Sequence, residues 1–420
     1  MLTAAGPAGV SIAKLRDLLA VVQTDNPFYR RKLAGVAEVD TFAAFQACVP
    51  FTTKRELVED QAAHPQYGSN LTYPLDRYTR FCQTSGTAGR PLRWVDTPES
   101  WEWMLGNWMR VFEAAGAEPG DRVFCAFSFG PFLGFWTAFE AATRMGYMAI
   151  PAGGMRSAAR LALLLETEAT ILCCTPTYAL HLAEVANEER TDLSRSRVRR
   201  IIVAGEPGGS IPGTRAQIER EWPGAKVVDH HGMTEIGPVS YGCPARANAL
   251  HVIESSYIAE IIDPLTAKLA APGAAGELVL TNLGRIGSPL IRYRTGDLVQ
   301  PGPPGLCACG TSDLALEGGI LGRTDDMVVV RGVNVYPGAV DDILRRCGGV
   351  AEYRVETHVS KALVELAIQV EAAAGYDADD LAHRIEGALR DSLSLRIPVC
   401  VVPAGSLPRF EMKAKRWIRV

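Results

Sequence analysis

Apolar residues recur at helical spacing over the first part of the chain. The clearest run lies on one face of a predicted helix and consists of Ile12, Leu15, Leu18, Leu19 and Val22. Positions three and four residues apart share a face of an α-helix. Polar residues separate the apolar stretches that follow. The pattern over residues 10–65 therefore predicts several helices joined by polar connections.

Short apolar runs alternate with helical patterns through the middle of the chain. Strands are predicted at residues 122–127, 147–151, 171–174 and 200–204. Helices are predicted at residues 101–115, 157–168 and 178–189, with a further one ending near Met145. This alternation predicts a largely parallel sheet covered by helices on both faces. The glycine-rich residues 205–209 directly follow a strand, where such sheets commonly bind ligands.

The pattern changes twice in the second half. Strands at 258–262 and 277–281 flank a turn and indicate a smaller β subdomain that ends near Val299. Past Gly322 a compact α+β tail follows, with strands at 327–330, 352–358 and 363–370 and helices at 339–346 and 379–393. The sequence therefore predicts an α/β protein with a large domain over residues 1–324 and a small one over residues 325–420.

Composition narrows the class of protein. The chain has 420 residues, of which 47% are hydrophobic and 21% charged, as is usual for a soluble enzyme with a sizeable core. The formal net charge is −4 without a basic tract, which argues against nucleic acid as a main partner.

No apolar run is long enough to span a membrane, and the start lacks a signal-peptide pattern. We therefore expect a cytoplasmic protein. Its ten cysteines are irregularly spaced, so a disulfide framework is not expected.

The segment Thr84–Pro91 reads Thr-Ser-Gly-Thr-Ala-Gly-Arg-Pro. Glycines let backbone N–H groups approach an anion, while hydroxyls and a guanidinium add further donors. The segment is therefore a candidate polyphosphate-binding loop, although it lacks the Gly-x-x-x-x-Gly-Lys pattern of kinases and GTPases. The alternative is a flexible surface loop. The candidate ligands are Thr84, Ser85, Gly86, Thr87, Gly89 and Arg90.

Three further motifs follow in order: Gly232-Met233-Thr234-Glu235, Tyr293-Arg294-Thr295-Gly296-Asp297, and Gly322-Arg323-Thr324-Asp325-Asp326 continuing to Pro337. Together with the Thr84 loop, they resemble the adenylate-forming superfamily of acyl-CoA synthetases, peptide-synthetase adenylation domains and luciferases. Ala204-Gly205-Glu206-Pro207 and the ending Pro408–Arg416 are similar to the phenylacetate–coenzyme A ligase branch. The resemblance runs from about Thr84 to the C-terminus.

The resemblance implies an ATP site that contains Mg²⁺. The Thr84 loop would hold the β- and γ-phosphates, Thr234 would donate to the α-phosphate, and Glu235 would be the Mg²⁺ ligand. The alternative for Thr234 is a helix N-cap beside an acid. His231 would stack on adenine or face the acyl pocket, unless it is a structural histidine. Gly205, Glu206 and Pro207 would also contact the nucleotide.

The remaining motifs supply further roles by the same resemblance. Asp297 would accept hydrogen bonds from the ribose hydroxyls, the alternative being a turn aspartate. Arg323 would lie near the phosphates or ribose, and Asp325 would be the hinge of a mobile C-terminal domain. Lys413 would be the catalytic lysine. The alternatives at this end of the chain are Lys415 and Arg416.

Four residues between the second motif and the tail could hold a metal ion. Three thiols and an imidazole form a tetrahedral structural zinc set. The spacing Cys-x-Cys is shorter than usual, but some relatives in the resembled family carry such residues at similar places. Four unrelated residues are the alternative. The predicted zinc ligands are Cys243, His251, Cys307 and Cys309.

The predicted activity is an ATP-dependent ligase that converts an aryl or arylacetic carboxylate to an acyl-AMP and transfers it to coenzyme A. Aromatic side chains suit a pocket for an aromatic ring. Transfer to a carrier protein or amine, and an inactive nucleotide-binding regulator, are the alternatives. The sequence leaves a homodimer open. The predicted pocket consists of Phe127, Phe132, Trp136, Ala204 and Gly232, and ordinary core packing is the other interpretation of the aromatic residues.

Overall fold

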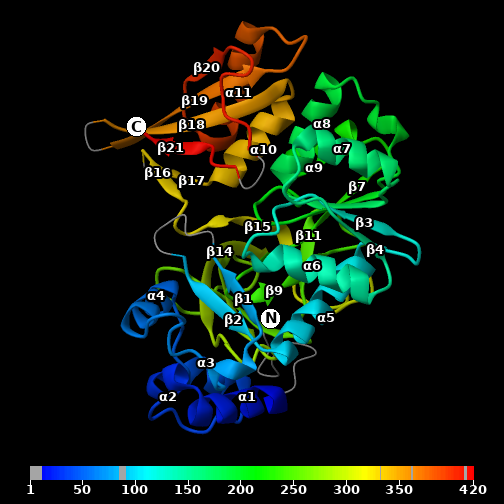
Figure 1. The fold of residues 1–420 in the computed structure, drawn as a ribbon. Helices are drawn as coiled ribbons and strands as arrows, with labels where there is room; N and C mark the ends of the chain where they lie inside the picture. Colours follow the sequence, from blue (N-terminus) through cyan, green and yellow to red (C-terminus); the bar gives the residue numbers. More distant parts are fainter. Residues whose placement is uncertain (1–11, 85–90, 332, 361–362, 411–413) are drawn as a thin grey trace. The chain divides into compact units, whose positions relative to one another are not determined.

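The computed structural model describes residues 12–84, 91–331, 333–360, 363–410 and 414–420. They form two compact units, one of residues up to 154 with 230–318, and one of 155–229 with 319–420 (Figure 1). Each unit is described separately. The mixed α/β class predicted from the sequence is confirmed by both units. Within the described residues, no helix has the length and apolar character needed to cross a membrane.

The first unit begins with four helices and then alternates strands with helices. Its helices are α1 (Ile12–Asp25), α2 (Pro27–Lys32), α3 (Phe42–Cys48), α4 (Lys54–Ala63), the short 3₁₀ helix η1 (Leu75–Arg77), α5 (Pro98–Ala114) and α6 (Leu133–Arg144). The antiparallel hairpin β1 (Arg80–Gln83) and β2 (Arg93–Asp96) precedes α5. Strands β3 (Arg122–Cys125) and β4 (Met148–Pro151) pair in parallel.

The predicted helices form where apolar spacing and caps agree. Helix α1 buries Leu15, Leu18, Leu19 and Val22, as its periodicity predicts. Helix α5 begins three residues earlier than predicted because the Thr97 side chain accepts from the Ser100 N–H and Pro98 suits the first turn. Its buried face carries Trp101, Met104, Trp108, Val111 and Phe112.

The β subdomain of the first unit is larger than predicted. Its antiparallel sheet has the order β10-β11-β15-β14-β13-β12. The prediction that it ends near Val299 is wrong, because a later strand lies between β11 and β14. Glycines 318 and 319, both with positive φ, interrupt the strand pattern there. The strands are β10 (Ser240–Gly242), β11 (Ala249–Val252), β12 (Tyr257–Ile262), β13 (Gly276–Asn282), β14 (Tyr293–Pro301) and β15 (Ala315–Arg323), preceded by the small hairpin β8 (Gly232–Met233) and β9 (Gly237–Pro238).

The second unit contains a parallel arrangement of strands and helices. Strands β5 (Ile171–Cys174), β6 (Arg200–Val203) and β7 (Lys226–Asp229) pair in parallel. The intervening helices are α7 (Ser157–Glu166), α8 (Pro176–Glu188), η2 (Leu193–Arg195) and α9 (Pro212–Glu221). Strand β5 is buried along its whole length, as expected for a strand covered on both faces.

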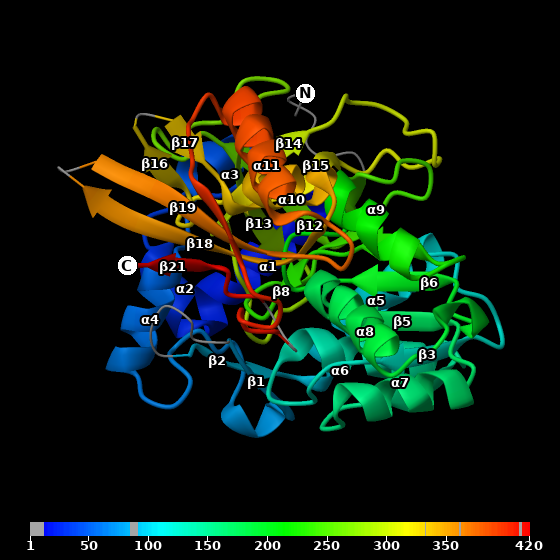
Figure 2. The ribbon, with the colours of Figure 1, turned by 90° about the horizontal axis from the view of Figure 1, so that it is seen from above.

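The tail of the second unit is a separate sheet covered by two helices. The sheet order is β17-β16-β19-β18-β21, and β20 also pairs with β19. Helices α10 and α11 pack against it and share its core of buried aliphatic side chains (Figure 2). The elements are β16 (Val328–Val330), β17 (Val333–Val335), α10 (Pro337–Cys347), β18 (Val350–Ser360), β19 (Leu363–Ala372), α11 (Ala378–Leu393), β20 (Val399–Val402) and β21 (Trp417–Arg419).

Candidate active site

The predicted phosphate loop connects the two strands of the β1–β2 hairpin. Thr84 fixes its first end: its backbone N–H donates to the Leu92 carbonyl at 2.9 Å, and its hydroxyl accepts from the Leu92 N–H at 3.0 Å. Thr84 is buried, so this end of the loop is anchored to the hairpin. The other predicted ligands, Ser85, Gly86, Thr87, Gly89 and Arg90, lie outside the described residues.

Thr234 and Glu235 lie in the turn between β8 and β9. The alternative that Thr234 caps a helix is therefore wrong. Gly232 is required at the start of this hairpin, because a Cβ there would lie 2.9 Å from the Gly237 carbonyl oxygen. The hairpin thus places Thr234 and Glu235 in a tight turn between two strands whose backbones lie close together.

The Glu235 carboxylate is buried and faces a cation. Lys54 Nζ lies 3.2 Å from its Oε1, and the lysine side chain is about half exposed, at 52%, while that of Glu235 is 7% exposed. Lys54 is the first residue of α4, whose start is fixed by a capping box between Thr53 and Glu56. Lys54 belongs to none of the sequence motifs, and only the capping pattern marks its position.

His231 and Asp297 come together although 66 residues separate them. The His231 Nε2 and Asp297 Oδ2 atoms lie 3.0 Å apart, and both side chains are largely buried. Asp297 lies on β14, where the Thr295 hydroxyl accepts from its N–H at 3.0 Å and Gly296 has φ +77°. In the described part of the chain, His231 Nδ1 has no hydrogen-bond partner. Two predicted nucleotide ligands thus form one polar pair.

His230 precedes this pair and belongs to the core. Its ring packs on Trp108, with centroids 4.3 Å apart, and its Nδ1 lies 2.6 Å from the Ser240 carbonyl oxygen. Burial lowers the pKa of His230 to about 4, so the ring is neutral near pH 7. The consecutive histidines therefore have different environments, one in the core and one bound to Asp297.

Two of the predicted aromatic pocket residues, Phe127 and Trp136, pack against Phe129. The ring centroids of Phe127 and Trp136 lie 5.5 and 4.9 Å from that of Phe129. Trp136 Nε1 also donates to the Gly130 carbonyl at 3.0 Å. Phe132 is partly buried and immediately precedes α6. Phe129 was not among the predicted pocket residues, because the segment carries many aromatic residues and their spacing does not show which one is central.

In the second unit, the segment Ala204–Pro207 follows strand β6. Gly205 has φ +95°, which glycine adopts readily. Glu206 Oε1 accepts from the Thr177 N–H at 2.9 Å, at the start of α8, and its Oε2 accepts from the Ala414 N–H at 2.8 Å. Glu206 therefore holds the backbone next to the predicted catalytic residue, Lys413, which itself lies outside the described residues.

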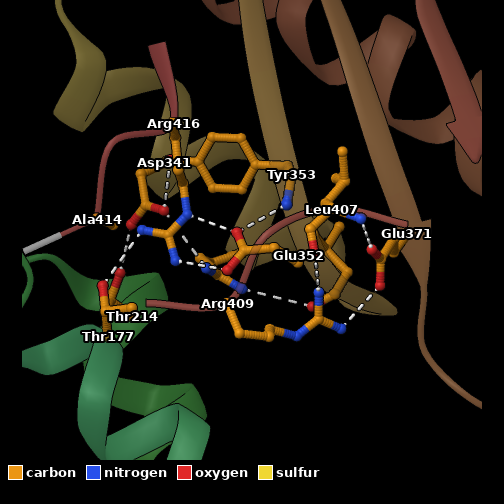
Figure 3. A network of polar contacts seen from close by, with 12 residues as sticks. Thr177, Thr214, Asp341, Glu352, Tyr353, Glu371, Leu407, Arg409, Ala414 and Arg416 are labelled. Atoms are coloured by element: carbon orange, nitrogen blue, oxygen red, sulfur yellow. Dashed lines mark hydrogen bonds and ion pairs between the residues drawn. The ribbon is translucent and has the colours of Figure 1, made fainter. Parts of the chain in front are cut away.

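Arginine–carboxylate pairs hold the chain end on both sides of that position (Figure 3). Arg416 binds Glu352 through Nε at 2.6 Å and Nη2 at 3.0 Å. Arg409 Nη2 donates to Glu371 at 2.7 Å. Arg416, an alternative to Lys413, is thus bound to Glu352, whereas Lys415 is exposed.

The predicted hinge residue Asp325 forms an ion pair with Arg323. The Arg323 Nε and Asp325 Oδ1 atoms lie 2.8 Å apart, and both side chains are substantially exposed. Arg323 is the last residue of β15 and Asp325 follows it, and both lie in the part of the chain after Gly318 that belongs to the second unit. Two predicted functional residues therefore contact each other at the position where the sequence places the hinge.

The predicted zinc ligands gather in the first unit. The ligand atoms of Cys243, His251, Cys307 and Cys309 all lie within 4.8 Å of one another. The Cys243 and Cys307 Sγ atoms are 3.7 Å apart, and Cys309 Sγ lies 3.5 Å from His251 Nε2. Two thiolates on a tetrahedral zinc lie about 3.8 Å apart, given Zn–S bonds of about 2.3 Å. The fold thus brings the four predicted ligands together.

A buried acid beside a cation and a His–Asp pair, together with the Thr84 motif of the sequence, define a candidate nucleotide-dependent enzyme. Comparison with family models agrees. The model described as AMP-binding enzyme matches residues 47–284, and the one described as AMP-binding enzyme C-terminal domain matches residues 332–419. The chain belongs to the AMP-binding enzyme family.

Individual relatives extend along almost the whole chain. Phenylacetate-coenzyme A ligase of Thermus thermophilus is 30% identical, with 95% of this chain and 93% of the relative covered. The Escherichia coli protein of the same name is 28% identical, with 93% and 89% covered. A crystal structure of 2-hydroxyisobutyryl-CoA ligase with an acyl-AMP is 30% identical with a TM-score of 0.90, covering 97% of this chain and 88% of that one.

His230 predicts an acid-dependent loss of stability. Its folded pKa of about 4 lies below the ordinary value of about 6.5. The unfolded chain therefore binds more protons between these values, so the stability contributed by neutral His230 is complete above about pH 6.5 and is lost as the pH falls toward 4. The free energy of unfolding of the wild type, measured relative to that of His230→Phe, should fall by about 2–3 kcal/mol from pH 7 to 4.5.

Urea unfolding at both pH values measures this change. His383→Phe, at an exposed position on α11, is the matched control. A constant difference between the wild type and His230→Phe at both pH values would contradict the assignment of His230 as a buried neutral ring.

Proposed function

We propose that this chain activates an aryl or arylacetic carboxylate with ATP and transfers the acyl group to coenzyme A. The class, an AMP-forming acid–CoA ligase, follows from relatives that match nearly the full length of the chain. The carboxylate attacks the α-phosphorus of ATP and releases pyrophosphate. The CoA thiol then displaces AMP and forms the thioester.

The observation that carries the proposal is the buried Glu235 carboxylate with a cation against it. The Lys54 ammonium lies 3.2 Å from this acid, and its half-exposed side chain has room to give way to a metal ion in this proposal. One carboxylate with phosphate oxygens and water is a donor set that Mg²⁺ prefers, so the residues fit the ion. Bound Mg²⁺ would offset phosphate charge, with Glu235 as its protein ligand.

The other residues bind or orient ATP in this proposal. Thr84 and the loop after it hold the β- and γ-phosphates, and Thr234 donates to the α-phosphate. Asp297 accepts from the ribose hydroxyls, while its contact with His231 orients both side chains beside the base. Fixed donors in such a site act mainly by holding two anions together as charge develops.

The tail supplies the remaining groups. We assign the division at 324/325 as a functional boundary, with Asp325 at the hinge of a mobile C-terminal domain. Lys413 bridges the carboxylate and the α-phosphate during adenylation, and Arg323 lies near the phosphates. The bonds of Glu206 to Ala414 and of Arg416 to Glu352 support this role of the chain end, because they fix the backbone beside Lys413.

An aromatic acid is the proposed substrate. The Phe127–Phe129–Trp136 cluster offers ring edges and faces, and two of the named relatives are phenylacetate-coenzyme A ligases. The small residues Ala204, Gly205 and Gly232 are assigned to the acyl pocket by the sequence resemblance alone. A cytoplasmic location is part of the same proposal, and a homodimer stays an open prediction.

Zinc is proposed for the Cys243–His251–Cys307–Cys309 cluster. Its three thiols and one imidazole suit the ion, and His251 Nδ1 lies 2.9 Å from the Asp313 carbonyl oxygen. A proton on Nδ1 leaves Nε2, which faces Cys309, free to bind metal. Zinc here would have a structural role, joining the β14–β15 connection to strand β11.

An ATP–pyrophosphate exchange screen tests the substrate class. Benzoate, anthranilate, hydroxybenzoates and phenylacetate should support faster exchange than acetate, long fatty acids or 2-hydroxyisobutyrate, because ring stacking favours the aromatic acids. A thioester assay with CoA then tests the acceptor. If 2-hydroxyisobutyrate or a fatty acid exceeds every aromatic acid, the proposed pocket is wrong. Exchange without a CoA thioester would favour a carrier protein or amine acceptor.

Elemental analysis tests the zinc proposal. Protein purified without added metal should contain about one zinc per chain, and Cys307→Ser with Cys309→Ser should lose it together with thermal stability. Cys48→Ser with Cys400→Ser changes two exposed cysteines and should retain the metal. A metal-free wild type of unchanged stability would contradict the site.

A further inference from the structure

Arg285 is a fully buried arginine that contacts the Thr234–Glu235 turn. Its Nη1 donates to the carbonyl oxygens of Thr234 at 2.7 Å and Glu235 at 3.0 Å. Its Nε and Nη2 bind the two carboxylate oxygens of Asp96, each at 2.6 Å. Neither the Arg285 nor the Asp96 side chain is exposed to solvent. One guanidinium therefore joins the last residue of β2 to the turn that carries Glu235.

The backbone around Arg285 is fixed independently. The Thr72 hydroxyl donates to the Ile286 carbonyl at 2.6 Å, and the Ser288 hydroxyl donates to the Val95 carbonyl at 2.8 Å. The Arg285 guanidinium also stacks on the ring of Trp94, 5.2 Å from its centroid. Both the backbone next to Arg285 and its guanidinium are thus fixed, so the donors that bind the turn have a defined position.

The chemistry of the Asp96–Arg285 pair indicates that it positions the Glu235 turn and does not merely stabilise the fold. A buried ion pair can often be replaced by apolar residues with little loss of stability, because desolvation offsets its attraction. A guanidinium, however, presents five N–H donors in a rigid plane, and Arg285 uses four of them here on three residues, Asp96, Thr234 and Glu235. Lysine has a single compact charge and cannot reproduce that arrangement.

We propose that Arg285, oriented by Asp96, is a positioning residue that sets the Glu235 carboxylate for the metal–nucleotide complex. The inference rests on the proposed function, because it takes Glu235 as the metal ligand. Arg285 does not touch the nucleotide in this proposal. It acts through the turn, and it links that turn to β2, the strand that leaves the phosphate loop.

The chain contains a matched control with the same local chemistry. Arg292 is buried, binds both carboxylate oxygens of Glu260 at 3.0 and 2.9 Å, and donates to the carbonyls of Gln46 and Val49. Its guanidinium stacks on Phe51 at 4.0 Å. These contacts hold the end of α3 rather than the Glu235 turn, so Arg292→Lys removes the same kind of buried pair at another place.

Equilibrium binding of MgATP, measured by titration calorimetry beside metal-free ATP in EDTA, tests the proposal. Arg285→Lys should raise the Kd for MgATP by about ten- to a hundredfold, as for loss of a residue that orients a metal ligand, and change the Kd for metal-free ATP far less. Arg292→Lys should lower the Tm while leaving both constants as in the wild type. If Arg285→Lys does not fold, Asp96→Asn removes the orienting charge at similar volume and should give the same selective loss.

The outcomes separate this inference from the proposed function. If Glu235→Gln loses MgATP affinity but folded Arg285→Lys or Asp96→Asn binds as the wild type does, the positioning role is overturned and the function stands. If Arg285→Lys and Arg292→Lys weaken MgATP equally, the effect is only structural and the inference fails. If the wild type does not bind MgATP, both proposals fail together.

Discussion

The buried contact between Asp96 and Arg285 is the constraint on which the candidate site depends. A charge with no exposure to solvent must have a close partner, and this pair has two 2.6 Å contacts. The remaining donors of Arg285 bind the Thr234 and Glu235 carbonyls. The end of the loop hairpin and the turn with the buried acid are therefore held by one side chain. Removing either charge would leave the other buried and unpaired.

The second unit uses similar chemistry at the chain end. Arg416 binds Glu352 and stacks on Tyr353, and its Nη1 lies 3.3 Å from the Thr177 hydroxyl. The Thr214 hydroxyl likewise donates to Asp341 at 2.7 Å. The contacts of Thr177 and Thr214 join the tail to helices α8 and α9, and Figure 3 shows all of these contacts as one network. The contacts of the Arg416 guanidinium thus fix the position of the chain end in this unit, and the Thr214 hydroxyl adds a further contact to the tail.

The sequence predicted much of the fold and part of the site. Apolar periodicity identified α1 and α5, and the motifs selected His231, Glu235 and Asp297. Strand β15 was missed because Gly318 and Gly319 break the apolar pattern.

Long-range partners were also missed, for a physical reason. Asp96 and Arg285 are 189 residues apart, and no local spacing marks an ion pair that only the folded chain creates. The Lys54–Glu235 contact could not be predicted either, because these residues are far apart in the sequence and meet only in the folded chain. Conversely, the Cys243–His251–Cys307–Cys309 cluster could be predicted because thiols and imidazole are distinctive by residue type alone.

The most direct test is a double-mutant cycle in ATP–pyrophosphate exchange with Glu235→Gln, Arg285→Lys and the combined variant. If Arg285 acts through the Glu235 carboxylate, its substitution should cost little once that carboxylate is absent, giving a coupling energy above about 1 kcal/mol. Additive losses within about 0.5 kcal/mol would show that the two residues act independently and would contradict this account.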